Sequence, residues 1–317
     1  MPSLSEIMSG NTTENPTPAT APTPTDTPAQ VEEKPPMSKE EWAQKQADKR
    51  TALYELRDEI ARESFVSPAS LTAALRAIAL HDRLSCMNAL LVLKQAPNAT
   101  MVRNFEAWSN AHDRSVTRGT KGIQILERIE YTRKDGSSGY GFDIAHVFDY
   151  SGTHGEALAP QGDMPNVQDL TQSLLAANEL AYIHSPTDTS IVVDIDARTV
   201  TAPDLDASAP GTFYALSSAI IAAKNPTFLP CECAAAAMVA CHRYGLDPKA
   251  EGGLSELFEG GQLLEASEQA QSLSKIGNAG KAQTRLIERT MGRTIPQPEQ
   301  PAMNKAKAKD NGREGGR

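Results

Sequence analysis

SCMNALLVLKQAPNATMVRNFEAWSNAHDRSVTRGTKGIQILERIEYTRKDGSSGYGFDIAHVFDYSGTHG, residues 85–155, is the stretch that carries the densest set of constrained residues. It opens with apolar residues at helical spacing that stop at Pro97, and a second helical pattern covers 98–112. Two runs of strand character follow, one after the glycine-punctuated segment TRGTKGIQI and one after the turn KDGSSG. The order helix, helix, hairpin predicts an α+β domain.

The same stretch is basic, although the whole chain is acidic. Between Arg103 and Lys134 there are seven Lys/Arg residues and four Asp/Glu residues, in a chain with a net charge of −9. Phe105 and Trp108 lie among these cations. A basic segment with aromatic residues predicts a site for a polyanion, and single-stranded DNA suits it because phosphates need cations and bases need stacking faces. The spacing of Phe105 and Trp108 alone favours core packing, with base stacking by Trp108 as the alternative.

Individual residues of this segment take different expected roles. Arg114, Arg118 and Lys121 are expected on phosphates, and two glycines beside them allow close approach of the backbone. Ser85 and Asn88, three apart, share one helical face, a pattern more typical of a solvated face than of a ligand contact. The candidate nucleic-acid-binding residues are Ser85, Asn88, Arg103, Trp108, Arg114, Arg118, Gly119, Lys121 and Gly122.

Towards the N-terminus the composition changes at Ser38. Residues 1–37 are rich in Pro and Thr and poor in large apolar residues, so a disordered tail is expected. From Ser38 a helix is expected, because Ser38 and Glu41 have the spacing of a capping box. Ser67-Pro68 begins a further helical run that continues to Pro97. The first domain is therefore placed at 38–155.

Towards the C-terminus a Pro/Gly-containing linker is expected at 156–166, then a mainly helical domain at 167–293 and a disordered basic tail at 294–317. The runs SIVVDID and RTVTAP predict a short hairpin, and helices are expected at 212–224, 231–245 and about 262–291. Residues 163–210 contain eight acids and one base, so this domain does not itself indicate DNA binding.

The chain is expected to be a cytoplasmic protein without membrane contact. It contains no apolar run near the roughly 20 residues that cross a bilayer, and its start lacks the pattern of a signal peptide. The four cysteines, Cys86, Cys231, Cys233 and Cys241, are therefore expected as reduced thiols.

The central stretch contains several spaced motifs, which are, in order, Ser85 and Asn88 in SCMN, Gln95 and Pro97, NATMVRNFEAW, Arg114, Arg118-Gly119, Lys121-Gly122-Ile123 and VFD at 147–149. With these motifs it resembles the N-terminal domain of the ArdC-type antirestriction proteins, also called LtrC-like, of plasmids and other mobile elements. The resemblance implies single-stranded DNA binding and a role in antirestriction or DNA transfer. Asp113 and Thr117 depart from the glycine and the basic residue usual in the family, and both changes lower the positive charge.

The resemblance also implies a zincin-like metallopeptidase domain at 167–293, in which the catalytic part is absent. A zincin needs HExxH on a helix, yet none of the six histidines is followed by Glu and no two are four apart. Ser217, Ser218 and Ile221 stand where ligands and base would be, and Ala234 where an acidic ligand would be. We therefore expect no catalytic residue, no metal and no cofactor.

Three alternatives remain open. A zinc site from Cys231, Cys233, Cys241 and His242 is disfavoured, because Cys-x-Cys within one helix points its sulfurs about 200° apart. A protein-interaction module, whose basic patch is only a solvated face, is the main alternative function, and protein partners are in any case considered for the C-terminal domain. A metal-dependent hydrolase would need ligands that the sequence lacks.

Overall fold

The computed structural model of the 317-residue chain describes residues 38–133, 135–158, 164–248, 254, 257 and 266–293. The predicted tails 1–37 and 294–317, Lys134 and the centre of the predicted linker, 159–163, lie outside these ranges. The described part mixes helix and sheet, which is compatible with the expected α+β class. None of its helices combines the length and the apolar character that a membrane span requires.

The chain divides into two compact units, 1–43 and 44–317. Of the first unit, the described residues form the start of α1 (Lys39–Ser64). Ser38 Oγ accepts the Glu41 N–H at 3.1 Å, and the Ser38 N–H donates to Glu41 Oε2 at 2.8 Å. This reciprocal pair satisfies two backbone donors at the helix start, so the predicted capping box is confirmed.

The helical run predicted from Ser67 to Pro97 is two helices, α2 (Pro68–Leu80) and α3 (Cys86–Gln95). Each begins after a serine whose hydroxyl accepts a backbone N–H: Ser67 from Ser70, and Ser85 from Asn88. The sequence pattern missed the break, because apolar residues continue at helical spacing through the turn between the helices.

A hairpin of β3 (Ile123–Thr132) and β4 (Ser138–Asp149) confirms the predicted strands. It is joined by β1 (Val102–Arg103) in the order β1-β4-β3, so β3 is a sheet edge. Helix α4 (Phe105–His112) leads into β2 (Arg114–Val116), which pairs with β5 (Thr153–Gly155) after the 3-10 turn Tyr150–Gly152. These short pairings, β1 with β4 and β2 with β5, were not predicted.

The C-terminal part contains the helices α5 (Val167–Ala177), α6 (Pro210–Lys224), α7 (Pro230–Arg243) and α9 (Ala266–Thr290). The predicted hairpin is present as β7 (Val192–Asp194) and β8 (Thr199–Ala202). A third strand, β6 (Ala181–His184), pairs in parallel with β8 and was missed. The architecture of a zincin-like domain stays a prediction.

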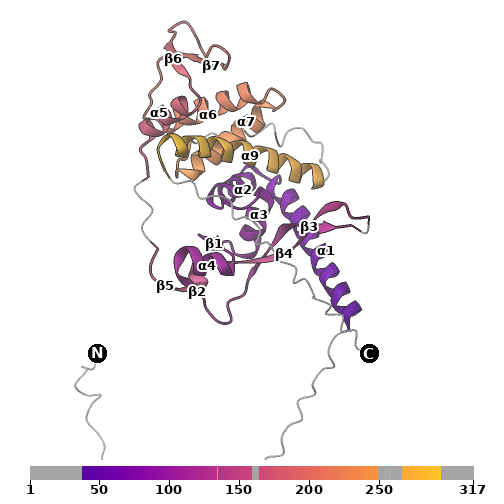
Figure 1. Ribbon diagram of the computed structural model, residues 1–317. Helices are drawn as coiled ribbons and strands as arrows, with labels where there is room; N and C mark the ends of the chain where they lie inside the picture. Colours follow the sequence, from indigo (N-terminus) through magenta and orange to yellow (C-terminus); the bar gives the residue numbers. More distant parts are fainter. Residues whose placement is uncertain are drawn as a thin grey trace, which may run out of the picture. The chain divides into compact units, whose positions relative to one another are not determined.

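The largest hydrophobic core joins helices from both predicted domains. Buried residues of α2 and α3, such as Leu71 and Leu90, share one cluster with Met238 of α7 and with Leu273 and Ile276 of α9. Figure 1 shows α9 beside α2 and α7, and contacts link all three helices. A domain boundary at 156–166 therefore stays a prediction, and side chains on its two sides pack into the same core.

A buried lysine strengthens the contact of α9 with the turn between α2 and α3. Lys281 Nζ donates to the carbonyl oxygens of His81 at 3.2 Å and Leu84 at 2.8 Å. These two carbonyls lie at the break between α2 and α3, where the helical hydrogen-bond ladder is interrupted. Burial lowers the pKa of Lys281, although neighbouring Cys86 and Asp82 oppose the shift.

Candidate nucleic-acid interface

A cavity of about 460 Å³ opens between α3, α4 and the β3–β4 hairpin. We call it the aromatic groove, because Phe105 and Phe142 line it with 60% and 47% of their surface exposed. Its lining consists of Arg83, Leu84, Ser85, Asn88, Asn104, Phe105, Glu106, Ile125, Leu126, Glu127, Arg128, Phe142, Ala145, His146 and Val147. Two exposed rings on one cavity form a surface on which planar groups can stack.

The hairpin register brings a cation beside the ring of Phe142. Arg128 on β3 is paired directly with Phe142 on β4, so both side chains leave the same face of the hairpin. The Arg128 guanidinium also lies 3.9 Å from the centre of the Tyr140 ring. A signal for the two aromatic residues was present in the sequence, since Tyr140 and Phe142 have the two-residue spacing of one strand face. Our sequence reasoning nevertheless left Phe142 out of the candidate site.

Asn88, predicted to bind nucleic acid, is instead buried against the edge strand β3. Its Nδ2 donates to the Leu126 carbonyl oxygen at 2.9 Å, and the Leu126 N–H donates to its Oδ1 at 3.0 Å. Gln95 forms the same reciprocal pair with the backbone of Gln124, at 2.7 and 3.0 Å. The two amides thus satisfy edge groups that have no neighbouring strand on that side. Asn88 therefore holds α3 to the sheet, and its contact with nucleic acid stays a prediction.

Ser85 keeps an exposed position at the rim of the aromatic groove. Its hydroxyl accepts the Asn88 N–H at 3.2 Å, so its first role is to cap α3. A hydroxyl that accepts one bond retains a donor, and Ser85 remains a candidate contact.

Trp108 is a core residue, so the alternative of base stacking is wrong. Its side chain is fully buried, and its Nε1–H donates to the Phe148 carbonyl oxygen at 2.9 Å. Its ring packs 5.3 Å from His112 and 6.2 Å from Tyr150, centre to centre. The core packing that the spacing favoured is confirmed, and the exposed ring of α4 is Phe105.

Arg114 does not lie on the surface, although it was predicted to contact phosphate. It is 6% exposed. Its guanidinium donates to Thr153 Oγ1 at 2.8 Å, to the Thr153 carbonyl at 3.0 Å and to the Gly155 carbonyl at 3.1 Å, and it also contacts the Glu156 carbonyl. It also lies 4.3 Å from the Tyr150 ring centre. These acceptors occupy the planar fork, so Arg114 fastens β2 to β5.

Asp113, just before Arg114, adopts φ +48° at the end of α4. This is the left-handed region that favours glycine, the residue the resembling family carries here. Asp113 thus replaces glycine at a position that requires a left-handed backbone, a conformation that Asp tolerates better than most residues.

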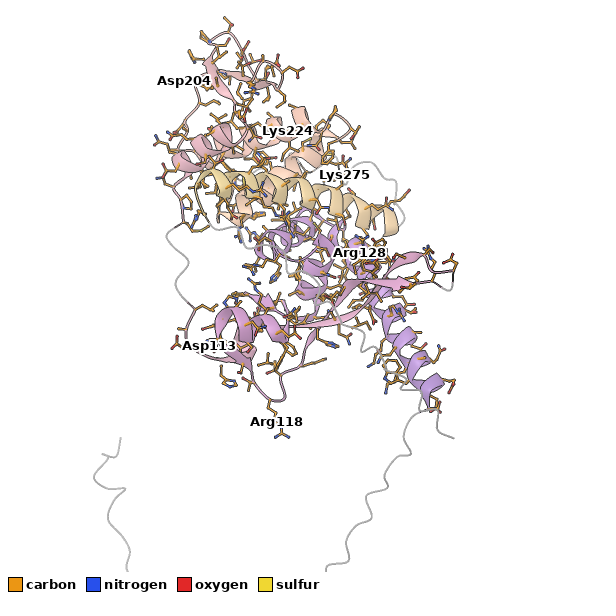
Figure 2. The ribbon with its side chains drawn as sticks, in the orientation of Figure 1. Asp113, Arg118, Arg128, Asp204, Lys224 and Lys275 are labelled. Atoms are coloured by element: carbon orange, nitrogen blue, oxygen red, sulfur yellow. The ribbon has the colours of Figure 1, made fainter. Side chains whose placement is uncertain are left out.

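The loop 117–122, between β2 and β3, holds two exposed cations. Arg118 and Lys121 are both exposed, and Figure 2 shows Arg118 pointing away from the ribbon. Gly119 adopts φ +89°, which requires a residue without Cβ. A Cβ on Gly122 would lie 3.0 Å from His146 Cδ2, and His146 lines the aromatic groove. The loop therefore ends against the aromatic groove, and the assignment of these four residues to nucleic-acid binding stays a prediction.

Arg103 is half-buried and belongs to a different cavity from the aromatic groove. Its Nη1 donates to its neighbour's carbonyl, that of Val102, at 2.7 Å. The predicted surface thus separates into three parts: the groove with Ser85, the loop with Arg118 and Lys121, and a second cavity with Arg103.

The positions that would hold a zincin metal are largely packed in the core. Ser217 and Ile221 on α6 and Ala234 on α7 are buried, whereas Ser218 is half-buried and lines another cavity. The Ser217 hydroxyl has no hydrogen-bond partner among the described residues. Within the same ranges, no three His, Cys, Asp or Glu side chains lie close enough together to hold a metal ion.

The three cysteines of α7 are buried free thiols. Burial raises the pKa of Cys241 to about 12 and also raises the pKa of Cys233.

No protein-family model and no curated protein matches this chain. Among solved structures, the chain is similar to the antirestriction ArdC protein from the R388 plasmid, in its Mn(II)-bound and its metal-free crystal structures. The identities are 12% and 13%, the TM-scores 0.42 and 0.43, and the matches cover 66% of this chain and 85% and 86% of the neighbours. These neighbours carry the name of the family that the sequence motifs resemble.

Proposed function

We propose that this chain binds single-stranded DNA in the aromatic groove and performs no catalysis there. The observation that carries the proposal is the pair of exposed rings, Phe105 and Phe142, on one cavity with Arg83 and Arg128. Stacking on aromatic side chains suits single strands, because every unpaired base presents a π-face whatever its identity. The motifs shared with ArdC-type proteins support the same ligand and a role in antirestriction or DNA transfer.

The charges around the groove indicate how the strand would be held. Arg118 and Lys121 supply exposed cations for phosphates at one end, whereas Glu106 and Glu127 lie on the groove itself. Stacking should therefore contribute more than charge. Two phosphate contacts on a single strand predict a salt slope of about −1.4. This value is smaller than three contacts would give, because Arg114 is withdrawn into the fold.

Binding of fluorescent oligothymidine, measured by anisotropy at two salt concentrations, tests the proposal. Phe105→Ala and Phe142→Ala should each weaken binding by roughly 5- to 150-fold, the range that corresponds to about 1–3 kcal/mol per stacked base. The matched control is Tyr182→Ala, an exposed aromatic residue of another sheet, which should leave binding unchanged. The double variant Arg118→Ala/Lys121→Ala should remove most of the salt dependence.

The proposal fails if oligothymidine does not bind at low salt. It also fails if both phenylalanine variants stay folded and bind as tightly as the parent. A purely protein-binding module would give the first of these results.

A further inference from the structure

The exposed aromatic surface continues beyond the aromatic groove. Phe142 lines the groove, and Tyr140, two residues earlier in β4, has 59% of its surface exposed. Side chains two residues apart in a strand leave the same face, about 6.5–7 Å apart along the strand. Arg128 and Glu130 of β3 are paired with Phe142 and Tyr140, so all four side chains share this face. We call Arg128, Glu130, Tyr140 and Phe142 the hairpin face.

Arg128 connects the two rings of the hairpin face. It lines the groove together with Phe142, and its guanidinium lies 3.9 Å from the centre of the Tyr140 ring. This cation–π contact restricts the orientation of the ring and leaves more than half of its surface to solvent. A ring that is already held in place loses less conformational entropy when a base stacks on it.

The charges of the hairpin face favour a base over a phosphate beside Tyr140. Glu130, the residue paired with Tyr140, is exposed, and its carboxylate repels phosphate. Arg128 and Glu130 together give the face no net charge. A strand that contacts Tyr140 is therefore held there by stacking, which depends little on salt.

The opposite face of the hairpin carries a second tyrosine in a different arrangement. A Cβ added to Gly139 would lie 2.8 Å from Tyr131 Cζ, and one added to Gly141 would lie 3.4 Å from Tyr131 Cε1. The Tyr131 ring thus lies over the backbone of these two glycines, although 46% of its surface is exposed. Tyr131 and Tyr140 have the same side chain in the same hairpin and differ in the face that they occupy.

A strand of more than a few nucleotides must extend outside the aromatic groove, whose volume of about 460 Å³ suits one ligand of drug-like size. The loop 117–122 precedes Ile123 at one end of the hairpin, and the turn between β3 and β4 is at the other end. Figure 1 shows this turn extending away from α3 and α4. The cations of the loop and the ring of Tyr140 therefore lie in opposite directions along the hairpin.

We propose that Tyr140 stacks on a base of the single strand whose neighbouring bases lie in the aromatic groove, so that the hairpin face lengthens the DNA site. This inference rests on the proposed function. It makes Tyr140 a contact for long strands only, whereas Phe105 and Phe142 contact short and long strands alike.

Fluorescence anisotropy of the whole chain with oligothymidines of about 4 and about 12 nucleotides, within the usual range of site sizes, tests the proposal. The quantity compared is the ratio of the long-strand affinity to the short-strand affinity. Tyr140→Ala should lower this ratio by roughly 5- to 150-fold, the range that one stacked base supplies. Tyr140→Phe keeps the ring and should keep most of the ratio. Tyr131→Ala, the matched control on the opposite face, should leave the ratio unchanged.

Salt dependence separates the hairpin face from the loop 117–122. A neutral ring releases no counterions, so Tyr140→Ala should lower the ratio by the same factor at low and at high salt. A fall that disappears at high salt would mean that Tyr140 acts through charge, against the inference.

Two further outcomes would overturn the inference. One is an unchanged ratio in Tyr140→Ala. The other is an equal fall in Tyr131→Ala, which would show that the integrity of the hairpin and not one ring determines the ratio. In both cases, strand binding that depends on Phe105 leaves the proposed function standing. If the parent chain binds neither strand, the inference and the proposed function fail together.

Discussion

Arg114 and Arg118 are four residues apart in one basic segment, but their side chains lie in opposite environments. Arg114 is enclosed by carbonyls of 153–156, whereas Arg118 is exposed. The difference depends on β5, which lies about 40 residues further on and pairs with β2. Local sequence contains no sign of that pairing, so composition predicted the basic segment correctly and assigned the wrong arginine to phosphate.

Arg114→Ala should lower the free energy of unfolding by about 1.5–3 kcal/mol, because it removes the hydrogen bonds that a charged group donates to Thr153 and Gly155. Arg118→Ala should change stability by less than about 0.5 kcal/mol, as expected of an exposed residue. Urea unfolding of both variants measures the contrast. Equal stability of the two would contradict the buried role of Arg114.

His81 makes stability depend on pH. Its side chain is buried, and burial together with the charge of Lys281 lowers its pKa to about 4. In the unfolded chain the pKa of a histidine is about 6.5, so between about pH 6.5 and pH 4 the unfolded chain binds a proton at His81 and the folded chain does not. Stability is therefore complete above about pH 6.5 and falls as the pH drops towards 4, by up to about 1.4 kcal/mol per pH unit.

Urea unfolding between about pH 7 and about pH 5 measures this slope, above the range in which most carboxylates titrate. His242, whose pKa is also lowered to about 4 by burial, adds a second contribution of the same sign. His81→Gln should remove only its own share. A slope that is the same in parent and variant would exclude His81 as the source.

The hairpin and its attachment to α3 show which elements sequence can predict. Alternation along β3 and β4 was sufficient for the strands, because their pairing is local. The strand β6 was missed, since its four residues are all exposed and its partner β8 follows after another strand. The motif residues Asn88 and Gln95 were noticed, but their hydrogen bonds to β3 were not predicted, because an amide on a helix gives no sign of which backbone it will meet.

Asn88→Ala should destabilise the chain by about 2–4 kcal/mol, since it leaves the buried N–H and C=O of Leu126 without partners. Asn88→Ala should weaken the binding of oligothymidine only indirectly, because the loosened contact between α3 and β3 changes the shape of the aromatic groove. Hydrogen exchange of the Leu126 amide would report the local opening directly. The matched control is Ser85→Ala, which should cost about 1 kcal/mol through the lost cap. Unchanged Leu126 protection in Asn88→Ala would contradict the edge contact.

The shared core bears on the two domains predicted for the molecule. Leu71, Leu75 and Ile78 of α2 are fully buried in a cluster that α7 and α9 complete. The composition change at 156–166 predicted a domain boundary. Composition shows which segments are polar, but it does not show which helices pack against each other. The fragment 38–158 should therefore show no cooperative thermal transition, whereas 38–293 should unfold cooperatively.

Circular dichroism of the two fragments measures this difference. Mixing 38–158 with 164–293 should restore the transition, because the missing core surfaces are supplied in trans. A cooperative transition of 38–158 alone would establish the domain boundary at 156–166. The shared core would then be an interface between two domains that fold independently.

The bonds of Lys281 to the turn at 81–84 also determine when the protein can fold during its synthesis. They join residues about 200 positions apart, and α9 is the last helix in the described part of the chain. A nascent chain therefore exposes the apolar faces of α2 and α3 until α9 has left the ribosome. At roughly 5–20 residues per second, that interval is on the order of tens of seconds. Chaperone dependence is thus expected to follow translation speed, and slow codons before α9 should increase aggregation.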